Sequence, residues 1–278
     1  MHSPLALLPL IASAAVTNYT GSSILDATDW NDATNWDNGL PRYEGANVDA
    51  YIGDTFNVAT TASYEYLTSG GKYDVYIGNA GIASFTISAG HTFNAGENKD
   101  IYVGNRTVDA VGTGTLTVAG TLLAGDEVRI GQTSYATVGT LSVVDGGTLT
   151  AATTTIQLYR GEMLIGSTAN VSMGGLLRLN TLNDTYEGEV NMTTNGAAIG
   201  TINGLGTLDV EFDNNSTLVL THTGAEAVGD SWTVMQNVEN FYEYGSTTAG
   251  GHFGYIKTQD DAPGDPNARL YSADYSSG

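Results

Sequence analysis

The 278-residue chain contains no cysteine, so its stability has to come from packing and backbone hydrogen bonds rather than from disulfides. Basic residues are also scarce: nine lysines and arginines stand against 30 aspartates and glutamates, giving a formal net charge of −21. Such a field repels polyanions, so we expect neither nucleic acid nor an anionic membrane surface as a partner. The five prolines are too few for a disordered proline-rich tract. The apolar stretch within residues 1–16 is shorter than the roughly 20 residues that span a bilayer, so we expect no membrane span.

What the chain does contain is a phrase that recurs about every 26 residues. An apolar residue and a glycine open it at 76–78, 102–104 and 129–131, with spacings of 26 and 27. A strand that alternates Thr or Ser with apolar residues follows, and a second glycine-led strand completes each unit. Self-similarity at this period is typical of solenoids, and the unit is too short for a propeller blade of about 40 residues.

We therefore predict an all-β fold, a single-stranded parallel β-helix or solenoid with atypical end-caps. Apolar residues of each strand should face the core and hydroxyl residues the solvent, with glycines at corners that need positive φ. The predicted organisation has four parts: an apolar signal-like or strand-donor segment at 1–16, an N-terminal cap with the first coils at 17–60, repeats of about 26 residues at 61–224, and a C-terminal cap and loop at 225–278.

The first 16 residues have two interpretations. Their apolar stretch and the triplet Ala12-Ser13-Ala14 resemble a secretory signal, although the basic residues that usually open one are missing. Alternatively, the segment is a strand that inserts into its own solenoid or into a neighbouring subunit. The residues that we expect to make assembly contacts are apolar or aromatic and come from both ends of the chain: Leu5, Leu7, Leu8, Leu10, Ile11, Val16, Trp30, Trp36, Trp232, Phe241, Tyr242 and Tyr244.

Two clusters of aspartates flank the repeat, one in the N-terminal cap and one in the last loop. Their members are Asp26, Asp29, Asp32 and Asp37, and Asp260, Asp261 and Asp265. Hard oxygen ligands at irregular turns suit calcium, so calcium is the one cofactor that the sequence suggests. Neither cluster has the spacing of an EF-hand or of a calcium-binding nonapeptide repeat, and solvated turn acids are the simpler interpretation.

Several motifs together resemble a known class of secreted proteins. They are Trp30 and Trp36 followed by Gly39-Leu40-Pro41, the repeated Gly-Thr-Leu-Thr-Val strands, and the stretch 229–234 followed by 250–253. On these motifs, most of residues 28–256 resembles the autotransporter-associated and PEP-CTERM-associated β-strand repeat proteins of bacteria. The resemblance implies a right-handed β-helix outside the cell or on its surface, and it implies no particular chemistry.

The leading functional hypothesis is an extracellular structural protein whose copies join head-to-tail into surface or matrix filaments. An uncapped β-helix end exposes unpaired backbone groups and apolar core, which favours joining to another molecule. The first alternative is a cell-surface adhesin that binds extracellular polysaccharide. We predict no enzyme activity, because the four histidines are far apart and no catalytic motif occurs.

A polysaccharide lyase or hydrolase is the weaker alternative, because β-helices host such enzymes and opposed carboxylates suit them. Its candidate residues are expected on two different strand faces: Asp209, Glu211 and Asp213 on one, and Arg129, Arg160 and Arg178 on another.

Overall fold

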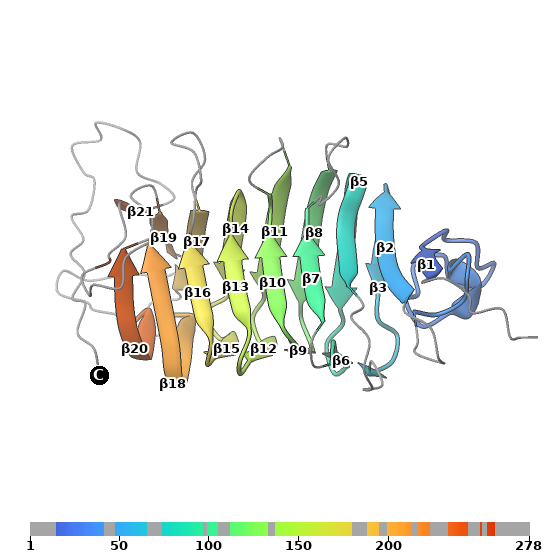
Figure 1. The fold of residues 1–278 in the computed structure, drawn as a ribbon. Coiled ribbons are helices and arrows are strands. Elements are labelled where there is room, and N and C mark those ends of the chain that lie inside the picture. The colour runs from blue at the N-terminus through green and yellow to red at the C-terminus, as the bar shows by residue number, and fades with distance from the viewer. Residues whose placement is uncertain are drawn as a thin grey trace, which may run out of the picture.

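The computed structural model describes residues 15–41, 48–65, 74–96, 99–104, 112–132, 137–179, 188–194, 199–212, 216–222, 233–243, 251 and 255–258. Over these residues the chain is nearly all β. Its 21 strands belong to one sheet that winds into a solenoid, and the one helix described is η1 (Ala33–Asn35), a single 3₁₀ turn. The predicted fold class is confirmed. Figure 1 shows the strands side by side along a rod, from β1 at one end to β20 and β21 at the other.

Successive turns of the chain add strands to three stacks, and the pairings between the described strands are parallel throughout. The first stack contains β1 (Ala15–Asn18), β2 (Val48–Asp54), the start of β5 (Val75–Ile87), β7 (Asp100–Val103), β10 (Glu127–Ile130), β13 (Thr155–Leu158), β16 (Leu176–Leu179), the end of β18 (Thr201–Phe212) and the end of β20 (Met235–Glu243).

The second stack contains β3 (Asn57–Ala59), the end of β5, β8 (Gly112–Val118), β11 (Val138–Val143), β14 (Gly161–Ile165), β17 (Gly188–Thr194), β19 (Thr217–His222) and β21 (Tyr255–Thr258). The third contains β4 (Tyr64–Glu65), β6 (Thr92–Asn94), β9 (Thr121–Leu123), β12 (Thr148–Ala151), β15 (Asn170–Met173) and the starts of β18 and β20.

Alternation along each strand separates core from surface. In β8, Leu116 and Val118 are buried, whereas Thr115 and Thr117 are half-exposed. The next strand of the stack keeps the same register, so that Leu141 lies directly beside Leu116. Because inner rows of this kind continue from turn to turn, the apolar side chains form one continuous core along the rod. The predicted division between apolar and hydroxyl residues is confirmed for these strands.

The glycine of the repeated phrase follows the first-stack strand in three successive turns, where the chain turns a corner. Gly78, Gly104 and Gly131 have φ angles of 76°, 91° and 71°. At Gly131 an added Cβ would also lie 2.1 Å from the carbonyl oxygen of Arg160. Both the conformation and the close approach therefore require glycine, as the sequence predicts for a corner.

Candidate functional site

The N-terminal end of the core is closed by aromatic side chains of the chain itself. Trp30 is fully buried and Trp36 is 4% exposed, with ring centroids 4.7 Å apart in an edge-to-face arrangement. The indole Nε1 of Trp36 donates a hydrogen bond to the carbonyl oxygen of Trp30 at 3.0 Å. We expected both residues to make contacts between copies. In the structure both side chains are instead buried within one chain, so little of their surface is left to contact another copy.

The outer edge of β1 is also covered by the same chain. Residues 35–39, here called the edge segment, run antiparallel to β1, with Tyr19 and Trp36 forming the antiparallel bridge. The backbone N–H of Asn18 donates to Oδ1 of Asp37 at 2.8 Å, and the N–H of Asp37 donates to the carbonyl of Asn18 at 3.1 Å. Nδ2 of Asn38 donates to the carbonyl of Val16 at 2.7 Å. Backbone and side-chain groups of the edge segment together thus take the place of a further strand at this edge.

The sequence places Val16 in the segment that could pair with another subunit. In the structure Ala15 and Val16 belong to β1 and pair with Val48 and Asp49 of the same chain. The Val16 side chain is 41% exposed. The pairing therefore leaves only residues 1–14 of the predicted donor segment. These residues lie outside the described ranges, and they include Leu5, Leu7, Leu8, Leu10 and Ile11.

The four aspartates of the N-terminal cap accept hydrogen bonds from groups of the same chain. Oδ1 of Asp26 accepts from the Thr28 hydroxyl at 2.6 Å and from the Thr28 N–H at 2.8 Å, and these bonds lower the pKa of Asp26. Asp32 bonds Thr34 in the same way, and its pKa is lowered by hydrogen bonds from Ser23 and Thr34.

Asp29 accepts from the hydroxyl of Thr61 at 2.7 Å and from the N–H of Asn31 at 2.8 Å. Burial raises the pKa of Asp37, but hydrogen bonds from Asn18 and Thr17 outweigh burial and leave that pKa below its usual value. Within the described ranges, no three His, Cys, Asp or Glu side chains are grouped so that they could hold a metal ion. Asp260, Asp261 and Asp265 lie outside those ranges, and calcium binding stays a prediction.

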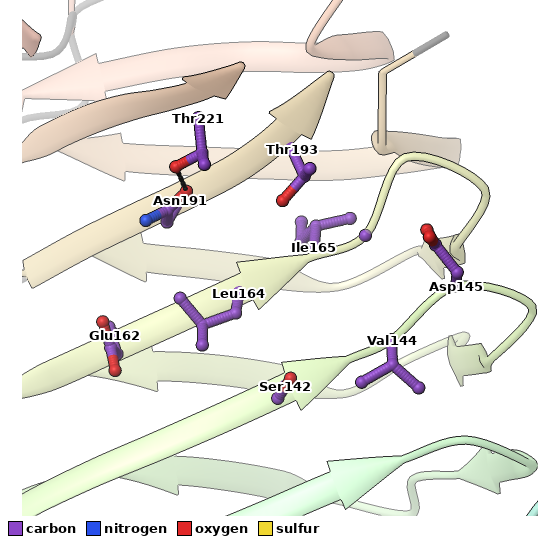
Figure 2. Close-up of a pocket in the computed structure, with 10 residues that line it drawn as sticks. Ser142, Val144, Asp145, Glu162, Leu164, Ile165, Asn191, Thr193 and Thr221 are labelled. Carbon is purple, nitrogen blue, oxygen red and sulfur yellow. Dashed lines mark hydrogen bonds between the residues drawn. The ribbon is translucent and has the colours of Figure 1, made fainter. Parts of the chain in front are cut away.

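A groove of about 520 Å³ lies on the outer side of the second stack, over β11, β14, β17 and β19. Figure 2 shows Glu162 and Asp145 at opposite ends of this groove with Leu164 between them. Asn191 and Thr221 form one wall, where the Thr221 hydroxyl donates to Oδ1 of Asn191 at 2.7 Å. The groove therefore combines hydrogen-bonding groups with an apolar patch.

Each carboxylate of the groove has a protein partner. Oδ1 of Asp145 accepts from the N–H of Thr168 at 3.0 Å and from the hydroxyl of Ser167 at 3.2 Å. The Thr168 N–H is the main reason why the pKa of Asp145 is lowered. Glu162 accepts from the Thr140 hydroxyl at 3.2 Å. The sequence prediction did not include these residues, because each is an ordinary outward or turn position of the repeat and only the stacking of turns brings them together.

The outer side of the first stack carries a ladder of tyrosines. The rings of Tyr51, Tyr76 and Tyr102 are stacked, with centroids 4.4 and 4.9 Å apart and planes within 9° of each other. The hydroxyls of Tyr76 and Tyr102 donate to Asp74 and Asp100, each at 2.9 Å. Because neighbouring rings cover each other's faces, this ladder is packing between turns rather than an open platform on which a sugar could stack.

Four of the residues proposed for polysaccharide cleavage lie in the first stack rather than on separate faces: Arg129, Arg178, Asp209 and Glu211. Arg178 on β16 and Glu211 on β18 are register partners in the first stack, and Nε of Arg178 lies 2.6 Å from Oε2 of Glu211. Arg129 forms a similar pair with Glu127 at 2.6 Å on its own strand. Charges of opposite sign therefore neutralise each other here, and Asp213 lies outside the described residues.

At the C-terminal end, Phe241 is partly buried against the core, and its ring lies 6.0 Å from that of Phe212. Tyr242, beside Glu211 in register, is partly exposed. The other two aromatic residues expected at this end, Trp232 and Tyr244, lie outside the described residues. The part of the chain that the structure describes contains no helix with the length and apolar character to cross a membrane.

No protein-family model, no curated protein and no solved structure matches this chain. What the fold and these sites define is a class: a parallel β-solenoid whose N-terminal end is closed by its own chain. The resemblance to autotransporter-associated and PEP-CTERM-associated repeat proteins, with the right hand that it implies for the coil, stays a prediction.

Proposed function

We propose that the protein is an extracellular structural rod whose copies join head-to-tail into surface or matrix filaments. The observation that carries this proposal is the polarity of the rod. Parallel pairing gives it two unlike ends, β1 at one and β20 with β21 at the other (Figure 1). A contact between unlike ends is heterologous, and heterologous contacts that do not close a ring generate filaments.

The two ends differ in a way that supports a lent strand as the joint. Within the described residues, β20 pairs only with β18 and β21 only with β19, so neither has a strand partner on its outer side. The apolar residues 1–14 precede β1 at the opposite end. We propose that this segment pairs with the last turn of the next copy, which is the donor-strand mode of β-addition.

Deletion of residues 2–14 tests this joint. We expect the deletion variant to stay a folded monomer by size-exclusion chromatography and circular dichroism, while the full chain forms filaments visible by electron microscopy. A matched variant keeps the length of the segment but replaces its apolar side chains by serine, and it should fail to assemble in the same way. Filaments that persist unchanged in both variants would overturn the proposal.

N-terminal sequencing of protein recovered from the medium separates the two interpretations of residues 1–14. A mature chain that starts at Ala15 would keep all of β1, because β1 begins at that residue. That result would identify residues 1–14 as a secretion signal and would exclude them as the joint. A mature chain that retains them is the result that the donor-strand proposal requires.

A second candidate function is glycan binding, and the groove over β11, β14, β17 and β19 favours it. Its amide, hydroxyl and carboxylate groups can bond sugar hydroxyls, and Leu164 offers an apolar surface to the C–H face of a ring. The net charge of −21 favours neutral over anionic polysaccharides.

Affinity electrophoresis in gels that contain neutral polysaccharides tests this candidate. Asn191→Ala should lose the retardation shown by the unaltered protein. Thr117→Ala is the matched control, because Thr117 is in the same outer row as Asn191 but outside the groove. Equal retardation of both variants and the unaltered protein would exclude the groove as the binding site.

A further inference from the structure

Three asparagines of the chain are followed directly by glycine: Asn38-Gly39, the pair at 195–196, and Asn203-Gly204. In such a pair the asparagine side chain and the next backbone nitrogen can react with each other, because glycine has no side chain that hinders their approach. Residues 195 and 196 lie outside the described ranges, so the structure compares Asn38 with Asn203. These two sites differ in how firmly the main chain is held.

Asn38 lies in a turn at the surface of the cap. Its side chain is exposed and Gly39 is half-exposed. The N–H of Gly39 donates to the carbonyl of Trp36 at 3.3 Å, which is longer than the usual range for such a bond. A Cβ added at Gly39 would have nothing within 4 Å. The backbone nitrogen of Gly39 therefore has room to approach Cγ of Asn38.

Asn203 is held by a strand on each side. It lies in β18, where it pairs with Ser172 of β15 and with Gln236 of β20. Its Oδ1 accepts from Nδ2 of Asn237 at 2.8 Å, and a Cβ added at Gly204 would collide with the carbonyl oxygen of Asn237. Attack by the Gly204 nitrogen would require this main chain to rotate out of the sheet. The same dipeptide is therefore protected here.

We propose that Asn38 is a site of spontaneous deamidation and that its conversion loosens the edge segment. In the first step the backbone nitrogen of Gly39 bonds to Cγ of Asn38, and Nδ2 leaves as ammonia with the proton that this nitrogen gives up. Water, the one co-reactant, then opens the succinimide ring. Opening at Cγ yields aspartate, and opening at the main-chain carbonyl carbon yields isoaspartate. The proposal does not depend on filament formation or on glycan binding.

The Asn38 amide is one of the groups that hold the edge segment on β1. Its Nδ2 donates to the carbonyl of Val16 at 2.7 Å. Either product replaces this donor by a carboxylate, which only accepts hydrogen bonds and repels the carbonyl oxygen. Isoaspartate also adds a carbon atom to the main chain between Asp37 and Gly39, which both bond to β1. The lengthened chain does not fit both contacts in their present geometry.

Ageing of the unaltered full chain in mildly alkaline buffer tests the reaction, because the attacking Gly39 nitrogen must lose its proton. Peptide mapping by mass spectrometry, with fragmentation that distinguishes isoaspartate from aspartate, measures both products. We expect conversion at Asn38 to be about tenfold or more faster than at Asn203, which requires a barrier only about 1.4 kcal/mol higher at Asn203. Both products should form at Asn38. Equal conversion at the two sites, an unchanged Asn38, or aspartate alone would overturn the proposal.

Hydrogen exchange in the same samples tests the effect on the edge segment. The N–H of Asn18 donates to Oδ1 of Asp37, so it should exchange faster in the aged protein than in the fresh protein. Asn38→Gln is the matched control, because it keeps an amide donor but its longer side chain disfavours the five-membered ring. This variant should neither convert nor change its exchange on ageing. Circular dichroism checks that each sample stays folded. Converted Asn38 with unchanged exchange at Asn18 would overturn the loosening of the edge segment.

Discussion

The N-terminal cap (residues 19–41) and the solenoid body (the described residues between 74 and 212) satisfy their backbone groups in different ways. In the body, strands pair with strands of the same kind, as in the six consecutive register partners of β8 and β11. In the cap, the side chains of Asp26, Asp37 and Asn38 bond to backbone groups. Strand-on-strand pairing leaves an unpaired strand edge after every turn, so a further turn can always be added. Side chains that bond to backbone groups leave no such strand edge, and for this reason the cap can end a solenoid.

The largest expected effect compares a glycine of each region. Gly131 in the body has a φ of 71° and no room for a Cβ, which would lie 2.1 Å from the Arg160 carbonyl oxygen. Gly39 in the cap has a φ of 78° and nothing within 4 Å. We expect Gly39→Ala to cost about 1–2 kcal/mol from its φ angle, and Gly131→Ala to cost more than about 3 kcal/mol because the neighbouring turn must move as well.

Urea unfolding followed by circular dichroism measures both variants. The comparison assumes that the neighbouring turn is held against Gly131 in the body, whereas no other part of the chain lies within 4 Å of a Cβ at Gly39 in the cap. Equal losses of stability would show that adjacent turns can separate at the corner, and the distinction between the two regions would then be wrong.

The sequence predicted the body well because the body is periodic. The spacing of 26 and 27 residues places Tyr76, Tyr102 and Arg129 in equivalent positions, and the structure pairs these three in register. Alternation then decides which side of each strand is buried. Fold class, corner glycines and core rows follow from these two regularities alone.

The cap could not be predicted to the same depth. Asp37 and Asn38 meet β1 across about 20 residues of sequence, and no repeat specifies this pairing. The aspartates there suggested a cation, and that stays a prediction; their bonds to Thr28, Thr34 and backbone N–H groups could not be predicted from the sequence. The groove could not be predicted for a related reason: it depends on which outward side chains meet across four turns.

Acid is expected to have a smaller effect on stability, and it should destabilise the cap before the body. Hydrogen bonds lower the pKa of Asp26 and Asp32 and, against the effect of burial, that of Asp37. A lowered pKa stabilises the fold above the ordinary carboxyl pKa, and this contribution is lost as the pH falls through the lowered value. In the body, burial is the main cause of the raised pKa of Asp74, so acid favours the folded state at that residue.

We therefore expect the cap to loosen first below about pH 4. The buried Trp30 and Trp36 belong to the cap, so tryptophan emission should shift to the red before the β-sheet signal in circular dichroism falls. Relief of the net negative charge acts on both regions and does not produce a difference between them. Asp37→Asn removes one of the titrating groups and should narrow the gap between the two transitions. Coincident transitions in the unaltered protein would contradict a weaker cap.

The smallest effect is expected from an ion pair in the body. Arg178 and Glu211 are 2.6 Å apart, yet their side chains remain 26% and 18% exposed. Exposed pairs contribute about 0.2–1 kcal/mol, so Arg178→Met, which keeps the aliphatic stem, should lower the free energy of unfolding by less than about 1 kcal/mol. High salt should reduce even this difference. The backbone ladder between β16 and β18 holds the two residues in register without the charge, whereas among the described residues the outer side of β1 meets a single antiparallel bridge, between Tyr19 and Trp36. A loss well above 1 kcal/mol in urea titrations would mean that side-chain contacts also set the register of the body, as they do in the cap.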